Sequence, residues 1–352
     1  MASGRIFVRG SRARRIAATA LVASFGALAA VVGHGAVAQT PPAPQPTVIR
    51  IATLAPRGSS WMRVFNAWDR TLKQRTNKQL SLRFYPGGVQ GDERDVVRKM
   101  GNGQLDGGAI TSVGLGQIVR PVLVLQVPGL FRRYQDIDYV RERLTQELSA
   151  QFEQAGYKFL GWGDVGMARV FSNRPITRPS DFRNVRPWVW RDDPISQAFM
   201  EVVGATPVRL GVPEVLPSMQ TRIIDTVTAS ALAAVQLQWA GRVTHVTQQS
   251  DTVLVGATVM RKSVFDALPA DMQTALMETS AQAHATLVRT IRREDDAAFT
   301  TLRGRLTVTD LTSTQAEWER AAQQTRQRLA GRLYPPALLS RVETLAAEAR
   351  RR

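Results

Sequence analysis

The sequence predicts an α/β fold that is built from two units and spanned by one long helix. In two successive stretches, short apolar segments of strand length alternate with amphipathic segments of helix length. Such alternation is typical of parallel sheets flanked by helices. The third observation is an uninterrupted helical pattern over residues 270–302. At ~1.5 Å per residue this helix would extend roughly 50 Å, which is long enough to cross both units.

The first unit is expected at residues 48–165 and is completed by residues 251–295. Ser59 or Ser60 can cap its first helix. One face of that helix carries four large apolar residues, Met62, Phe65, Trp68 and Leu72. Later helices are expected from Gly91 to Met100 and over residues 137–154. The strands of this unit are expected at residues 48–54, 80–85, 106–111, 158–162 and, returning from further along the chain, 252–260.

The second unit is expected at residues 166–250 and 296–352. Its strands are expected at residues 168–172, 185–190, 206–210 and 223–227. Helices at residues 194–203 and 213–220 alternate with the last three of these strands. Two further helical stretches, at residues 315–333 and 337–349, close the chain. The two units are thus expected to be lobes connected by crossing segments.

The first 38 residues have the composition of a signal peptide. A basic segment with Arg5, Arg9 and Arg12 is followed by an apolar run over residues 16–32. Ala36-Val37-Ala38 supplies small residues for cleavage after Ala38, and residues 39–47 form a proline-rich lead-in. A membrane anchor and, from Arg14-Arg15, a twin-arginine export signal are the alternatives. The expected location is the periplasm, in soluble form after cleavage.

The composition argues against several classes of function. The 352 residues contain no cysteine, which excludes disulfides, lipid-modified cysteine and zinc–cysteine sites. The formal net charge of +17 is spread along the chain without interleaved aromatic residues, so we expect no nucleic-acid partner. His34, His245 and His284 are far apart in the sequence, so we expect no metal and no cofactor.

No set of residues suited to catalysis emerges. Ser112-Val113-Gly114 lacks the preceding glycine of a nucleophile elbow. The carboxylate pairs Asp92-Glu93 and Asp192-Asp193 stand at expected helix starts, where acidic residues favour the helix dipole. We therefore expect a binding protein. An exported α/β enzyme is the alternative outside this class.

Several motifs occur in a specific order. They are Phe84-Tyr85-Pro86-Gly87-Gly88-Val89-Gln90-Gly91-Asp92-Glu93-Arg94, Gly103-Gln104-Leu105-Asp106, Ser172-Asn173-Arg174-Pro175-Ile176, Pro179-Ser180-Asp181-Phe182, Val203-Gly204-Ala205-Thr206-Pro207-Val208 and Ile224-Asp225. Together they resemble the extracytoplasmic receptors of tripartite ATP-independent periplasmic (TRAP) transporters, the DctP-type family. The resemblance implies a two-lobed periplasmic binding protein of the venus-flytrap type, with a long helix bridging both lobes. It also implies a small-molecule ligand and two membrane subunits as partners.

The chain departs from the family pattern at the ligand anchor. The arginine that usually forks onto a substrate carboxylate is replaced by Trp188, and an indole cannot form that bidentate pair. A second frequent arginine position aligns with Ala168, next to Arg169. This pattern resembles the subgroup that works with a periplasmic tetratricopeptide-repeat protein. It implies an apolar or amphipathic ligand; the alternative is an organic-acid receptor whose anchoring arginine has moved to Arg169 or Arg191.

The expected ligand-binding residues follow from these comparisons and from the strand ends. Trp190 shares a strand face with Trp188, and Trp61 follows the first strand, whose carboxyl end should face the cleft. Each tryptophan, Trp239 included, could also be a core residue. The expected set is Leu54, Trp61, Thr111, Leu115, Trp162, Arg169, Trp188, Trp190 and Ser230.

The signal peptide can be tested directly. N-terminal sequencing of the protein isolated from its native host should begin at Gln39 or within the next few residues, because the small residues before it fit the peptidase. A full-length chain found embedded in the membrane would contradict this prediction.

Overall fold

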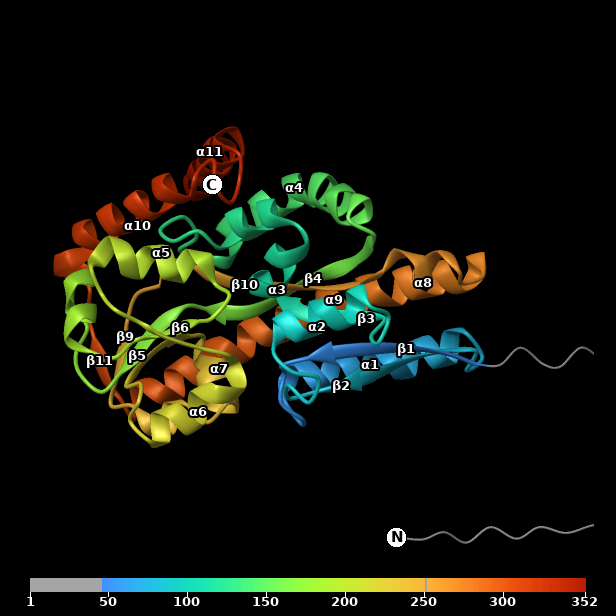
Figure 1. Ribbon diagram of the computed structural model, residues 1–352, viewed down its shortest axis with the longest axis horizontal. Coiled ribbons are helices and arrows are strands. Elements are labelled where there is room, and N and C mark those ends of the chain that lie inside the picture. Colours follow the sequence, from blue (N-terminus) through green and yellow to red (C-terminus); the bar gives the residue numbers. More distant parts are fainter. Residues whose placement is uncertain (1–45, 251) are drawn as a thin grey trace, which may run out of the picture. The chain divides into compact units, whose positions relative to one another are not determined.

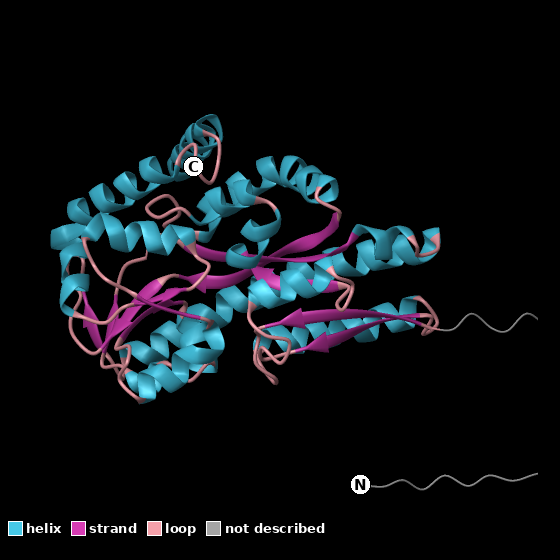
Figure 2. Cartoon of the chain, viewed as in Figure 1, coloured by secondary structure: helices cyan, strands magenta, loops and turns pink. Residues whose placement is uncertain are grey.

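The structure, a computed structural model, describes residues 46–250 and 252–352. The predicted signal peptide and the lead-in up to residue 45 lie outside the described residues. Two larger sheets and one pair of short strands form the framework, and helices surround them (Figures 1 and 2). Within the described ranges, every helix is too short or too polar to span a membrane.

The first sheet has five strands in the order β2-β1-β3-β10-β4. The strands β1, β2 and β3 are parallel, as predicted, whereas β10 is antiparallel to both β3 and β4. The predicted return of residues 252–260 to this sheet is confirmed. Because β10 comes back from the second unit, it enters the sheet in the opposite direction. The bounds are β1 Thr47–Thr53, β2 Leu80–Tyr85, β3 Gly107–Thr111, β4 Tyr157–Met167 and β10 Val253–Arg261.

Helices cover this first sheet and extend its core. The Ser59 hydroxyl caps α1 by accepting from the Met62 N–H at 3.3 Å, and all four residues of the predicted apolar stripe are buried. Burying this stripe against the sheet is what holds an amphipathic helix in place. The bounds are α1 Ser60–Arg75, α2 Glu93–Gly101, α3 Ser112–Ile118, the 3₁₀ helix η1 Arg120–Gln126, α4 Tyr134–Gln154 and α8 Lys262–Asp266.

The second sheet has four strands in the order β11-β9-β5-β8, and it is also mixed. The strand β5 is antiparallel to β8 and β9, while β9 is parallel to β11. A separate parallel pair is formed by β6 and β7. The bounds are β5 Arg169–Ser172, β6 Trp188–Trp190, β7 Val208–Leu210, β8 Thr226–Ala229, β9 His245–Thr247 and β11 Thr307–Thr309.

Two predicted strands begin three residues later than expected, for local reasons. Residues 223–227 were expected to be a strand, but the chain first turns at Arg222, whose φ is +59°, and β8 begins only at Thr226. The N–H groups of Ile223 and Ile224 both donate to the Ser218 carbonyl near the end of helix α6, Val212–Gln220. The strand expected from residue 185 begins only at Trp188, since Pro187 has no N–H for a ladder.

The remaining helices surround the second sheet, with one exception. The C-terminal helix α11 packs on α4, where Leu338 and Val342 share a core with Val140 and Leu144. We therefore propose that α11 belongs with the first lobe, and that the lobes otherwise follow the two sheets. The bounds are α5 Pro194–Val203, α6 Val212–Gln220, α7 Ala231–Gln236, α10 Gln315–Leu329, α11 Pro336–Arg351, η2 Pro179–Asn184, η3 Ala240–Arg242 and η4 Thr312–Thr314.

The long helix α9, Ala270–Arg303, confirms the prediction for residues 270–302. Leu276 and Ile291 on this helix belong to the core that α1 shares with the first sheet. Phe299 and Leu302 belong to the core beneath the second sheet. One helix therefore supplies apolar side chains to both cores, and Figure 1 shows it running from α8 toward β11.

The stretch where β4 passes toward β5 depends on Gly166. Its φ is +127°, and a Cβ at this position would lie 2.6 Å from both Ser230 Cβ and Asp295 Cγ. Gly156 also has a positive φ, +86°, but a Cβ there would meet no atom within 4 Å. The two glycines thus share a backbone requirement, and only Gly166 adds a steric one.

We expect Gly166→Ala to lower the free energy of unfolding by about 2–4 kcal/mol, from backbone strain and overpacking together. Gly156→Ala, the matched control, should cost only about 1 kcal/mol from the backbone term. Urea denaturation of the two variants measures the difference. An equal loss in both variants would show that close packing around Gly166 contributes nothing.

Candidate functional site

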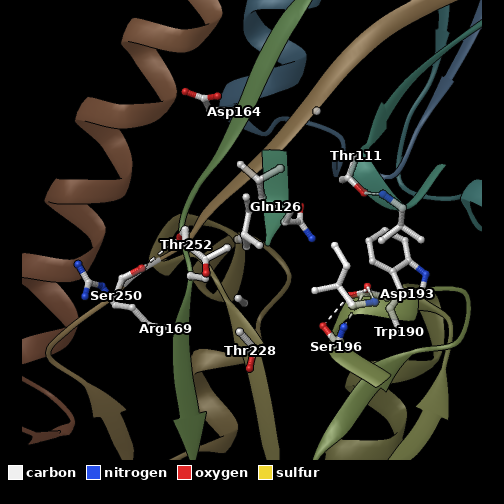
Figure 3. A pocket seen from close by; sticks show the side chains of 18 of the residues that line it. Thr111, Gln126, Asp164, Arg169, Trp190, Asp193, Ser196, Thr228, Ser250 and Thr252 are labelled. Atoms are coloured by element: carbon white, nitrogen blue, oxygen red, sulfur yellow. Dashed lines mark hydrogen bonds between the residues drawn. The ribbon is translucent and has the colours of Figure 1, made fainter. Parts of the chain in front are cut away.

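A cavity of about 410 Å³ is lined by residues from both sheets. The first sheet and its helices contribute Thr111 and Trp61, and the second contributes Arg169 and Thr228. Figure 3 shows side chains from these elements surrounding the open space. A volume of this size suits a small organic molecule.

Tryptophan rings form one wall of the cavity. Trp188 and Trp190 lie on one face of β6 because side chains alternate along a strand, and their ring centroids are 6.3 Å apart. Trp239 meets Trp188 edge to face at 5.3 Å. The Nε1–H of Trp188 donates to the Leu210 carbonyl at 3.0 Å, and that of Trp190 to Asp92 Oδ2 at 2.8 Å. These two rings therefore offer the cavity apolar faces rather than donors.

Arg169 is a further residue that lines the cavity. Its Nη1 donates to the Gln248 carbonyl, and the guanidinium carbon lies 3.5 Å from the centroid of the Phe299 ring. Its Nε is buried and has no hydrogen-bond acceptor among the described residues. Burial lowers the pKa of Arg169 from its usual value, while the nearby Asp295 counteracts this effect. The side chain is held in one orientation and retains an unused donor.

The side chain of Glu93 is buried, so it does not have the role expected of an acidic residue at a helix start. Asp92 caps α2, as expected for a helix start, but the Glu93 side chain turns to α3. It accepts from the Thr111 N–H at 2.7 Å, the Thr111 hydroxyl at 2.9 Å and the Gly114 N–H at 2.8 Å. Burial raises the pKa of Glu93 to about 7, and the neighbouring Asp92 adds to the increase. The cavity wall thus contains a carboxyl group that titrates near neutral pH.

Asp193 also lines the cavity and caps α5, which agrees with its expected position at a helix start. Its Oδ1 accepts from the Ile195 N–H at 2.9 Å and the Ser196 N–H at 3.2 Å, and its Oδ2 accepts from the Ser196 hydroxyl at 2.5 Å. Burial raises the pKa of this carboxyl group. Its hydrogen-bonding capacity is largely used by the helix that it caps.

A second aromatic group on the wall has no counterpart among the expected site residues. Phe199 and Trp318 stack with an interplanar angle of 12°, and Phe182 meets Phe199 edge to face. Beside them, Arg132 forms an ion pair with Glu319 and so connects the loop after η1 to α10. These residues are far apart in the sequence, and no motif joins them.

The structure separates the nine expected residues into two groups. Leu115 is fully buried in the core, the Trp162 indole donates to Thr145 Oγ1 at 2.8 Å, and Ser230 caps α7. These three do not line the cavity, so we leave them out of the proposed site. The other six line it: Leu54, Trp61, Thr111, Arg169, Trp188 and Trp190.

Two further residues that the sequence singled out have structural partners. Arg191 pairs with Glu214 at 2.7 Å and lies outside the cavity wall. His284 is buried between Ser280 and Thr258, and burial lowers its pKa to about 4. In the described part of the chain, no group of three or more potential ligands could hold a metal ion.

Comparisons with known proteins give consistent results. The model of the family described as "Bacterial extracellular solute-binding protein, family 7" (DctP) matches residues 51–331. The chain is 22% identical over 318 residues to the C4-dicarboxylate-binding periplasmic protein DctP of Rhodobacter capsulatus, covering 88% of this chain and 94% of that protein.

Solved structures of TRAP solute-binding proteins have the same fold. A Shewanella oneidensis protein with bound succinate gives a TM-score of 0.80 at 17% identity, covering 86% of this chain and 99% of that one. A Bordetella pertussis receptor binding pyroglutamic acid gives 0.78 at 16% identity, covering 87% and 100%. The predicted two-lobed α/β fold with a long bridging helix is thereby confirmed. The chain belongs to the DctP family of extracellular solute-binding proteins, and it is a receptor of a TRAP transporter rather than an enzyme.

Proposed function

We propose that this receptor captures an organic acid with an apolar body and delivers it to the TRAP membrane subunits. The ligand carboxylate binds Arg169, and its apolar part packs against Trp188 and Trp190. This proposal adopts the alternative of an organic-acid receptor with a relocated arginine, in place of the main expectation of an apolar or amphipathic ligand.

The observation that carries the proposal is the state of Arg169. A guanidinium within an apolar wall is costly unless an anion and acceptors satisfy it. Its Nη1 is bound to the Gln248 carbonyl and its ring contact is with Phe299, while its Nε has no acceptor among the described residues. A ligand carboxylate would supply the opposite charge for the guanidinium.

Known relatives favour an acidic ligand. The relative from Rhodobacter capsulatus is named for C4-dicarboxylates, and proteins of the same fold hold succinate or pyroglutamic acid. All of these ligands are organic acids. Of the two arginines considered as replacement anchors, Arg169 lines the cavity and Arg191 is paired with Glu214 outside it. These facts support Arg169 as the anchor.

The tryptophan wall supports an apolar body for the ligand. Trp188 occupies the position where the family resemblance places an arginine, and it is only 8% exposed. A large flat ring favours contact with aliphatic or aromatic carbon over contact with hydroxyl groups. The tetratricopeptide-repeat partner stays a prediction that depends on this same replacement.

We expect Arg169→Gln to weaken binding of an organic acid at least about 30-fold, since truncating one member of a buried charge pair costs about 2 kcal/mol or more. Arg191→Gln is the matched control and should bind normally. A thermal-shift screen of organic acids identifies a ligand, and isothermal titration measures its affinity for each protein. Equal affinity for wild type and Arg169→Gln, with both folded, would refute the anchor.

Glu93 predicts a pH dependence of binding. With its pKa at about 7, Glu93 is neutral below that pH and ionised above it, where its charge repels a ligand carboxylate. The affinity for an organic acid should therefore fall about fivefold or more between about pH 6 and about pH 8. Glu93→Gln should bind with nearly the same affinity at both values. A fall of the same size in the variant would assign the effect to another group.

A further inference from the structure

Many polar groups on the cavity wall already form hydrogen bonds within the protein. The indole N–H of Trp61 donates to the Asp164 carbonyl at 3.0 Å, and those of Trp188 and Trp190 have protein acceptors as well. The carboxylates of Glu93 and Asp193 accept from neighbouring backbone and hydroxyl groups. A ligand rich in hydroxyl groups would find few partners here, and each of its unpaired groups would cost binding free energy.

Gln126 differs from these groups. Its amide oxygen accepts a hydrogen bond within the protein, whereas its amide nitrogen donates none among the described residues. It ends η1, is 8% exposed and lines the cavity. Its Oε1 accepts from the Ser112 hydroxyl. Ser112 is fully buried, so its hydroxyl needs an acceptor, and Gln126 Oε1 provides it. The Nε2 amide is left as a donor without an acceptor among the described residues, and Figure 3 shows the side chain at the cavity.

The charged side chains described on the cavity wall can pair with one anionic group of a ligand. Of the two guanidiniums that line the cavity in the described part of the chain, Arg132 is paired with Glu319, which leaves Arg169 for a ligand. Glu93 and Asp193 have no cationic partner within the described ranges, and burial keeps their pKa values high. A second ligand carboxylate would face these carboxyl groups rather than a guanidinium, so it would be buried without a cationic partner, which is costly.

We infer that the ligand is a monocarboxylate with an apolar body and one further hydrogen-bond acceptor, and that Gln126 Nε2 donates to that acceptor. This inference rests on the proposed function, because it takes Arg169 as the carboxylate anchor. Gln126 is then the residue that selects oxygenated acids over plain fatty or aryl acids. The same wall disfavours dicarboxylates and sugar acids, for the reasons of charge and unpaired hydroxyl groups given above.

The test compares matched acids that differ by one carbonyl. Isothermal titration of the purified protein uses 4-phenylbutanoate, 2-oxo-4-phenylbutanoate and 4-oxo-4-phenylbutanoate, with succinate and glucuronate as contrasts. We expect at least one oxo acid to bind about fivefold more tightly than 4-phenylbutanoate, the value of one good hydrogen bond. Gln126→Met should remove this advantage, so that the oxo acids bind about as tightly as 4-phenylbutanoate does to the same variant.

A second variant guards against misfolding. Gln126→Met alone leaves the buried Ser112 hydroxyl unpaired, whereas the double variant Ser112→Ala with Gln126→Met removes both members of that hydrogen bond. It should give the same loss of selectivity with better stability.

The possible failures are distinguishable. If 4-phenylbutanoate binds and Arg169→Gln weakens it, but the oxo acids gain nothing or keep their gain in the Gln126 variants, this inference alone is wrong. If succinate or glucuronate binds as tightly as the best oxo acid, the selectivity against these classes is wrong. If none of the aryl acids binds, or if their binding does not depend on Arg169, the proposed function itself fails.

Discussion

The carboxylate of Asp295 is the interaction on which the arrangement of the two sheets depends. It lies on α9 and accepts from the N–H groups of Met167 and Leu232, both at 2.9 Å, and from the Tyr134 hydroxyl at 3.2 Å. These donors belong to the end of β4, to α7 and to the start of α4. Burial raises the pKa of Asp295, yet these hydrogen bonds favour its ionised form. One buried group thereby fixes the point where the chain leaves the first sheet.

The same carboxylate connects the fold to the ligand site. One turn further along α9, Phe299 lies beneath the guanidinium of Arg169, and the charge of Asp295 stabilises the cation without pairing with it directly. A guanidinium can therefore stay charged in a wall made mainly of aromatic rings. Under the proposed function, the anchor stands at the first residue of β5 rather than on strand β6, where Trp188 lies.

Much of the fold could be predicted because it depends on local patterns. The apolar stripe of α1 and the continuous pattern of α9 are periodic, and burial of those residues follows from their spacing. The direction of β10 could not be predicted from such patterns, because it is set by the path of the chain through the other sheet. The delayed start of β8 depends on a left-handed residue, Arg222, which hydrophobicity does not reveal.

The site was less predictable than the fold. Trp188 and Arg169 were singled out by comparison with a family pattern, and Trp190 by the alternation of side chains along the strand that it shares with Trp188. Glu93 looked like an ordinary acidic residue at a helix start, and only the packing of α2 against α3 shows that its side chain turns inward. The stack of Phe199 on Trp318 joins α5 to α10 across a long stretch of sequence, and single-sequence patterns carry no such information.

The most direct test of the account is a crystal structure of the receptor with a bound organic acid. We predict that a carboxylate oxygen lies about 2.8 Å from a nitrogen of the Arg169 guanidinium, while Nη1 keeps its bond to the Gln248 carbonyl and the body of the ligand lies against Trp188. A ligand whose carboxylate binds elsewhere in the cavity, without contact to the Arg169 guanidinium, would contradict it.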